Sequence, residues 1–157
     1  MVCCMQRIRL LTIGQLKTPW IRDGCSEFRK RISPLAMFDI EELPASKEKR
    51  PEKQVRQESI KLLDAFGGED VLVVLDERGK DMTTKEFAEF LSEHRDRGES
   101  MSFVIGGAYG VDDVVRDRSD HVIRLSALTF PHELSRLIFL EVLYRALDLL
   151  RGGKYHH

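Results

Sequence analysis

Cysteine is scarce in this sequence, and its few cysteines follow no regular spacing. Cys3, Cys4 and Cys25 form neither a CxxC pair nor a Cys/His ligand set. Because adjacent cysteines pair poorly and an odd count leaves no disulfide framework, we interpret all three as incidental or packed thiols. Such usage is typical of the reducing cytoplasm, where we expect the protein to be located.

Long apolar runs and a strong net charge are also absent. No stretch approaches the roughly 18–20 residues of a membrane-spanning helix, and the N-terminus lacks the pattern of a signal peptide, so we expect no membrane partner. The 25 basic and 26 acidic side chains give a net charge of −1, so bulk charge does not favour nucleic acid as a partner. A length of 157 residues with 42% hydrophobic content predicts a single domain over residues 1–157.

Apolar periodicity predicts alternating strands and helices, and therefore an α/β fold with a mostly parallel sheet flanked by helices. Thr83 and Glu86 form a predicted capping box at the start of one helix. The continuous apolar run VLVVL is typical of a strand buried on both faces. Strands are predicted over residues 7–13, 37–43, 71–75, 103–105 and 121–125, and helices over about 18–32, 51–66, 83–97, 111–115 and 131–150.

The last predicted helix is apolar nearly all round. Its polar positions reduce mainly to Glu141, Arg145 and Asp148, a narrow ridge on one side. An amphipathic surface helix needs only one apolar stripe, so we expect a second copy of the chain to cover the remainder and form a homodimer. The alternative is a central core helix within one chain.

Three strand ends could carry a ligand, because open α/β sheets bind ligands beyond the carboxyl ends of their strands. These ends are residues 75–79, 106–110 (GGAYG) and 125–130 (LSALTF). GGAYG fits neither a dinucleotide fingerprint nor a phosphate-binding P-loop, and a plain glycine turn is its simpler interpretation. His132 and Glu133 begin an HExxH pattern, but Arg136 occupies the second histidine position, so we predict no metal site.

The segment LSALTF is unusually apolar for a loop. Its side chains could line a pocket for an aromatic or thioether ligand, while its backbone and hydroxyl groups form hydrogen bonds with the polar edges of that ligand. The alternative is a buried turn beneath the last helix, with Thr129 as the N-cap and Pro131 in the first turn. For His132 we favour a structural role at the helix start.

The segments FVIGGAYG, LSALTFPHELSR, LIFLEVLYRAL and the closing KYHH resemble the RlmH family of ribosomal large-subunit pseudouridine methyltransferases, of the SPOUT class. The resemblance spans essentially the whole chain and includes VVLDERGK and LTIGQLK. It implies a homodimer whose C-terminal part forms a deep trefoil knot. It also implies transfer of a methyl group from S-adenosyl-L-methionine to ring nitrogen 3 of a pseudouridine in helix 69 of 23S rRNA, in the assembled ribosome.

The resemblance also implies site residues. Tyr155 and His156 would act near the substrate, with His156 as the candidate base. We expect Arg151, Lys154 and His157 to contact RNA, although His157 stands where the family commonly has Arg or Lys. The group Arg29 to Arg31 is a further basic candidate. The implied cofactor contacts are Leu75, Gly106, Leu125, Ser126, Ala127, Leu128, Thr129 and Phe130; here adenine would stack between apolar side chains, and Gly106 would leave room for the ligand.

Two other functions fit the same sequence. The first is a SPOUT methyltransferase for a different RNA site. The second is a cofactor-free, dimeric ribosome-binding factor. The near-zero net charge further suggests that recognition depends on the shape of an assembled ribosomal site, so we expect free rRNA to be a poor substrate.

Overall fold

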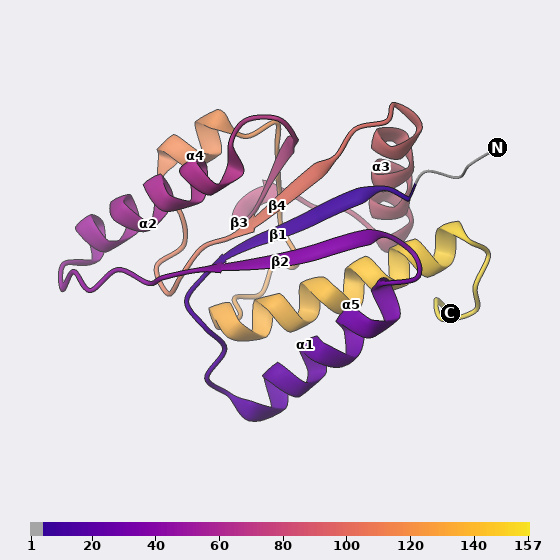
Figure 1. Ribbon diagram of the computed structural model, residues 1–157, viewed down its shortest axis with the longest axis horizontal. Helices are drawn as coiled ribbons and strands as arrows, with labels where there is room; N and C mark the ends of the chain where they lie inside the picture. The colour runs from indigo at the N-terminus through magenta and orange to yellow at the C-terminus, as the bar shows by residue number, and fades with distance from the viewer. Residues whose placement is uncertain (1–4) are drawn as a thin grey trace.

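The computed structural model describes residues 5–157, so Cys3 and Cys4, interpreted above as incidental thiols, lie outside the described residues. Five parallel strands form one sheet in the order β2-β1-β4-β3-β5, with helices on both faces (Figure 1). This confirms the predicted parallel α/β fold. The elements are β1 (Arg7–Ile13), α1 (Pro19–Ile32), β2 (Met37–Leu43), α2 (Pro51–Phe66), β3 (Val71–Lys80), α3 (Thr84–Asp96), β4 (Met101–Ile105), α4 (Asp113–Arg118), β5 (His121–Ile123) and α5 (His132–Leu150).

The sheet separates two hydrophobic clusters, because successive side chains of a strand point to opposite faces. On β1, Leu10 belongs to the cluster shared with α1, α3 and α5, whereas Leu11 belongs to the cluster shared with α2 and α4. Val73 and Val74 divide in the same way on β3. Both clusters therefore depend on the apolar runs recognised in the sequence.

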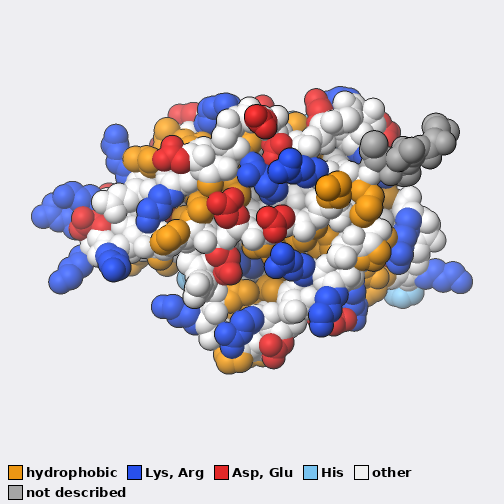
Figure 2. Space-filling model, in the orientation of Figure 1, with side chains coloured by type: hydrophobic (Ala, Val, Ile, Leu, Met, Phe, Trp, Pro, Cys, Tyr) orange, Lys and Arg blue, Asp and Glu red, His pale blue; other side chains and the backbone are white. Residues whose placement is uncertain are grey.

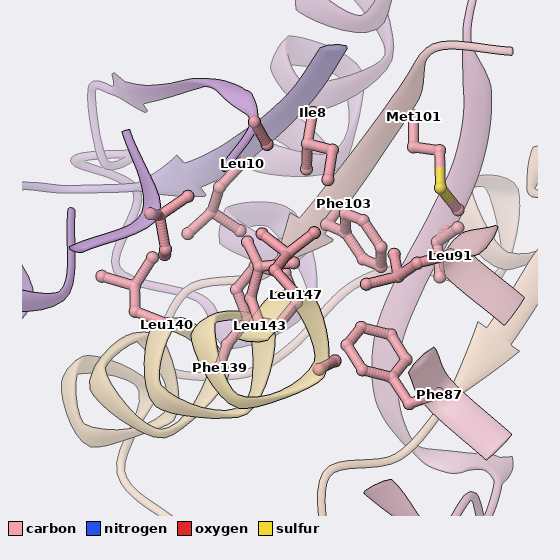
Figure 3. Close-up of a cluster of buried hydrophobic side chains, with 14 of the residues drawn as sticks. Ile8, Leu10, Phe87, Leu91, Met101, Phe103, Phe139, Leu140, Leu143 and Leu147 are labelled. Carbon is pink, nitrogen blue, oxygen red and sulfur yellow. The ribbon is translucent and has the colours of Figure 1, made fainter. Parts of the chain in front are cut away.

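Helix α5 is a core helix of this chain. Phe139 packs on Phe103 of β4 with ring centroids 4.9 Å apart, and Leu143 is fully buried (Figure 3). Helices α1 and α3 pack along its sides. Burial within one chain thus accounts for much of its apolar surface, while Leu134 and Leu137 stay only partly buried.

The capping box is confirmed, whereas several boundaries differ from the prediction. The Thr83 hydroxyl accepts a hydrogen bond from the Glu86 amide (3.2 Å), and the Glu86 carboxylate accepts one from the Thr83 amide (2.7 Å). Thr129 is not the N-cap of α5: Pro131 holds that position and makes no side-chain cap. A helix start beside an open cavity does not require a side-chain cap, because its free N–H groups can be met by water or a ligand.

Strand β3 continues to Lys80, five residues beyond the predicted run, and β5 ends at Ile123 rather than Leu125. The extension runs so close to β5 that a Cβ on Gly79 would lie 2.6 Å from the Ile123 Cα. Only glycine permits this approach. The register between the two strands shifts between Leu75 and Lys80, which leaves residues 76–79 without a strand partner on that side. Of these residues, Asp76, Glu77 and Arg78 line the candidate site.

Candidate functional site

A cavity of about 400 Å³ opens at the carboxyl ends of β3 and β4, against the loop that follows β5. It joins the three strand ends selected from the sequence. Seven of the eight predicted cofactor contacts line it, whereas Ala127 does not. The lining predicted residues are Leu75, Gly106, Leu125, Ser126, Leu128, Thr129 and Phe130.

The GGAYG segment forms a tight turn at the cavity floor. Gly110 donates a backbone hydrogen bond to Gly107 (3.0 Å) and adopts φ +77°, which favours glycine. A Cβ on Gly106 would lie 2.5 Å from the Gly110 carbonyl carbon. The missing side chain of Gly106 makes room for the turn itself, and Gly106 also lines the cavity, where its ligand contact stays a prediction.

Helix α2 braces this turn with two polar residues that sequence reasoning missed. The Ser59 hydroxyl accepts a hydrogen bond from the Asp112 amide (2.9 Å). Glu58 is 1% exposed; its Oε1 accepts one from the Ser46 amide (3.0 Å), while its Oε2 faces Gly107. Both lie on the helix face that also buries Leu62. Helical spacing from Leu62 was the signal that could have found them.

A charged wall at the cavity was also missed. Arg116 forms ion pairs with Asp76 (2.9 Å) and Asp113 (2.6 Å) and donates to the Val111 carbonyl (2.7 Å). Burial alone would lower the pKa of Arg116, but these two carboxylates raise it above its ordinary value. Arg78, 65% exposed, stands at the rim with a 3.5 Å contact to Asp113. Asp76 and Arg78 follow a predicted strand, but nothing in the sequence indicated Arg116 as their neighbour.

The loop 125–130 presents apolar side chains and uncommitted backbone groups. Leu128 is 74% exposed, and Tyr109, which also lines the cavity, is 58% exposed. Within residues 5–157, the only hydrogen bond donated by a backbone N–H of this loop runs from Leu128 to Ser126 Oγ (3.0 Å). The other backbone N–H groups of this loop are therefore available to hydrogen-bond a ligand. The loop is not the buried turn beneath the last helix that the sequence left as the alternative.

The C-terminal tail lies at the other end of α5 (Figure 1). Tyr155 donates from its hydroxyl to Glu141 (3.1 Å) and from its amide to Asp148 (3.0 Å), and the Arg145 guanidinium covers its ring at 4.6 Å. These partners belong to the C-terminal half of α5, whereas the cavity is lined by Ser135 in the first turn. Six residues from Ser135 to Glu141 span about 9 Å of helix. One chain thus does not bring the predicted catalytic tail to the cavity.

The predicted RNA-contacting residues have mixed surroundings. Arg151 is paired with the buried Asp148 (2.7 Å), while Lys154 and His157 are exposed. Arg29 and Arg31 each contact a carboxylate, Asp39 and Glu27 respectively. On the face in Figure 2, basic and acidic side chains are interspersed, and basic ones gather at the end where α2 begins. No single-sign surface is evident on this face.

In residues 5–157, no helix is long and apolar enough to cross a bilayer. No group of three or more His, Cys, Asp or Glu side chains in that range could hold a metal ion.

The chain has a parallel sheet with a cavity at its carboxyl edge. Comparison with known proteins identifies the class of protein to which it belongs. The model of the family described as "Predicted SPOUT methyltransferase" matches residues 6–156. The chain is 40% identical over 152 residues to the ribosomal RNA large subunit methyltransferase H of Trichlorobacter lovleyi, covering 96% of this chain and 99% of that one. It is 41% identical over 159 residues to the protein of that name in Symbiobacterium thermophilum, covering 96% and 99%.

A solved structure has the same fold at low identity. The tRNA (m1G37) methyltransferase of Aquifex aeolicus aligns with a TM-score of 0.55 at 15% identity, over 97% of this chain and 74% of that one. The chain belongs to the SPOUT methyltransferases, and its fold is shared with a solved member of that class. Within that class, the chain belongs to the family of the ribosomal RNA large subunit methyltransferases H.

Proposed function

We propose that this chain transfers a methyl group from S-adenosyl-L-methionine to ring nitrogen 3 of a pseudouridine in helix 69 of 23S rRNA, in the assembled ribosome. One observation carries the proposal: in a chain of this family, seven of the eight residues implied for the cofactor line one cavity. The cytoplasm, where ribosomes work, is the expected location.

The residues present fit the cofactor. A cavity of about 400 Å³ falls within the roughly 300–1,000 Å³ usual for small-molecule sites. Leu125, Leu128 and Phe130 offer apolar surface to a flat adenine ring, and the free N–H groups of the loop can bind its polar edge. When bound, the cofactor supplies a methyl group already activated on a sulfonium.

The chain's own residues then have two tasks. The cavity must hold the donor and the target nitrogen in line, which replaces a bimolecular encounter by a fixed approach. It must also favour loss of the imide proton, by a base or by a field that stabilises the anion. We propose that Tyr155 and His156 of the C-terminal tail take part in methyl transfer, although they lie away from the cavity of their own chain.

The separation of tail and cavity supports the proposed homodimer. A second copy could place its tail over the cavity of the first, and partly buried Leu134 and Leu137 offer apolar surface for that contact. Sedimentation should give a dimer. Deleting residues 155–157 should leave cofactor affinity intact and lower turnover, and full activity of the deletion would exclude the tail from the mechanism.

We also propose that residues 1–157 form one domain with a C-terminal trefoil knot. The close passage of Gly79 against Ile123, with a 3.1 Å hydrogen bond from the Arg124 amide to the Lys80 carbonyl, is compatible with threading of the following segment. Knotted chains are rare, so the proposal relies on the family.

RNA recognition is proposed to depend on a preassembled site. With a net charge of −1, the chain has little general attraction for phosphate, and Arg151, Lys154 and His157 would act locally. Methylation should be far faster on intact ribosomes than on naked 23S rRNA, and equal rates would refute this dependence. Ribosomes carrying uridine at the target should not be methylated; if they are, a different RNA site becomes the better assignment.

The decisive experiment for the enzyme itself is calorimetric titration of the purified dimer with S-adenosyl-L-methionine. Saturable binding, lost when Phe130 is replaced by a charged residue, is expected. A folded dimer without measurable binding would overturn the proposal in favour of a cofactor-free ribosome-binding factor.

A further inference from the structure

Few groups that line the cavity can take up a proton near neutral pH. Arginine has no basic lone pair to offer, and a phenol is already protonated. Asp76 is engaged by Arg116 at 2.9 Å and by the Arg78 amide at 2.9 Å. The remaining candidates among the lining residues are Glu77 and His132.

The His132 side chain is not committed to the structure of its surroundings. It is the first residue of α5, and within residues 5–157 neither ring nitrogen makes a hydrogen bond. Its neighbours are turned elsewhere: the Glu133 carboxylate accepts from the Thr18 hydroxyl (2.9 Å), and Arg136 donates to Glu42 (3.0 Å). A purely structural role at the helix start, favoured from the sequence, would leave this imidazole without a task.

We propose that His132, in place of the His156 implied by the resemblance, is a catalytic residue that accepts the proton of the ring nitrogen to be methylated. The inference rests on the proposed function. The N–H bond breaks and its proton moves to a free imidazole nitrogen of His132. The electron pair left on the ring nitrogen forms the bond to the methyl carbon, and the methyl–sulfur bond breaks with its pair on sulfur. One positive charge disappears from sulfur and one appears on the imidazole, so atoms and charge balance.

The electrostatic surroundings keep the imidazole neutral before the reaction. Burial lowers the pKa of His132 below its ordinary value of 6.5, and the charge of Arg136 acts in the same direction, as does Lys17. Glu133 and Glu58 oppose this effect but do not cancel it. The positive end of the α5 dipole also disfavours a charged ring. A base must be unprotonated to act, and the lowered pKa keeps the His132 imidazole unprotonated at neutral pH.

The test replaces His132 by glutamine and measures methyl transfer to ribosomes that lack the modification. General-base loss typically costs about 10²–10⁴-fold, so kcat should fall by that factor. The cofactor Kd and the KM for ribosomes should change little, because the proton is taken only during the reaction. Glu77→Gln tests the other free acceptor of the cavity, and it should lower kcat far less than His132→Gln does.

The pH profile separates a base from a residue that merely shapes the cavity. Wild-type kcat should decline as pH falls through the lowered pKa of His132, and the residual rate of His132→Gln should lack that decline. Near-wild-type kcat in His132→Gln, or loss of kcat in Glu77→Gln instead, would overturn the inference.

If His132→Gln lost cofactor binding, the wild-type profile would decide: a decline coinciding with the NMR titration of His132 supports the inference, and a flat profile overturns it. Wild-type protein that methylates no ribosomes at any pH would instead reject the proposed function as a whole.

Discussion

Replacing Gly106 by alanine is expected to distort the GGAYG turn and weaken cofactor binding through it. The added Cβ would lie 2.5 Å from the Gly110 carbonyl carbon, about 1 Å inside the roughly 3.5–4.0 Å of an ordinary carbon contact. The obstacle is backbone held by the 3.0 Å hydrogen bond between Gly110 and Gly107, so it cannot rotate away as a side chain would. The turn must therefore open.

The size of the effect follows from that geometry. Forcing an extra methyl group into a packed site typically costs about 1–3 kcal/mol. If the turn relaxes outward to relieve the clash, ligand binding has to restore it, and the same 1–3 kcal/mol corresponds to a roughly 5- to 150-fold weaker affinity. The predicted loss thus arises from the protein's own backbone, without any contact between the new methyl group and the ligand.

The assay is calorimetric titration with S-adenosyl-L-methionine, paired with urea unfolding of the same samples. Ala108→Ser is the control, because Ala108 is exposed in the same turn and already carries a Cβ. Wild-type affinity together with a wild-type unfolding midpoint in Gly106→Ala would show that the turn accepts a Cβ, and the reasoning would then be refuted.

Three further predictions concern stability. Leu143→Ala should cost about 2–5 kcal/mol in urea unfolding, because the side chain is fully buried and a cavity would remain. Thr83→Ala should cost about 1 kcal/mol by removing the N-cap of α3, and Thr83→Ser should restore most of it. Burial, with the charge of His94, lowers the pKa of His121, so protonation favours the unfolded chain. The contribution of neutral His121 to the free energy of unfolding is present above about pH 6.5 and is lost as pH falls through the lowered pKa. His121→Phe should weaken this acid dependence of the unfolding midpoint. An unchanged dependence would assign it to other groups.

The sequence by itself determined the elements and the edge where the cavity lies. Apolar runs such as VLVVL favour strands buried on both faces, as in a parallel sheet, and the capping box fixed the start of α3 through local bonds. The composition of the loop LSALTF left a ligand pocket and a buried turn as alternatives, and the eight cofactor contacts were implied by the family resemblance. Seven of those eight residues do line the cavity.

Only the tertiary structure decided which groups meet there. Glu58 and Ser59 come from α2, and Arg116 from α4, so their approach to the GGAYG turn and to Asp76 depends on packing across long sequence separations. The same packing placed Gly106 at the closure of its own turn, put the Tyr155 tail at the far end of α5, and left the His132 ring free in the cavity. Local sequence patterns encode secondary-structure propensity and burial. Which distant side chains meet at one site is set by how helices and strands pack across each other, and no local pattern contains that information.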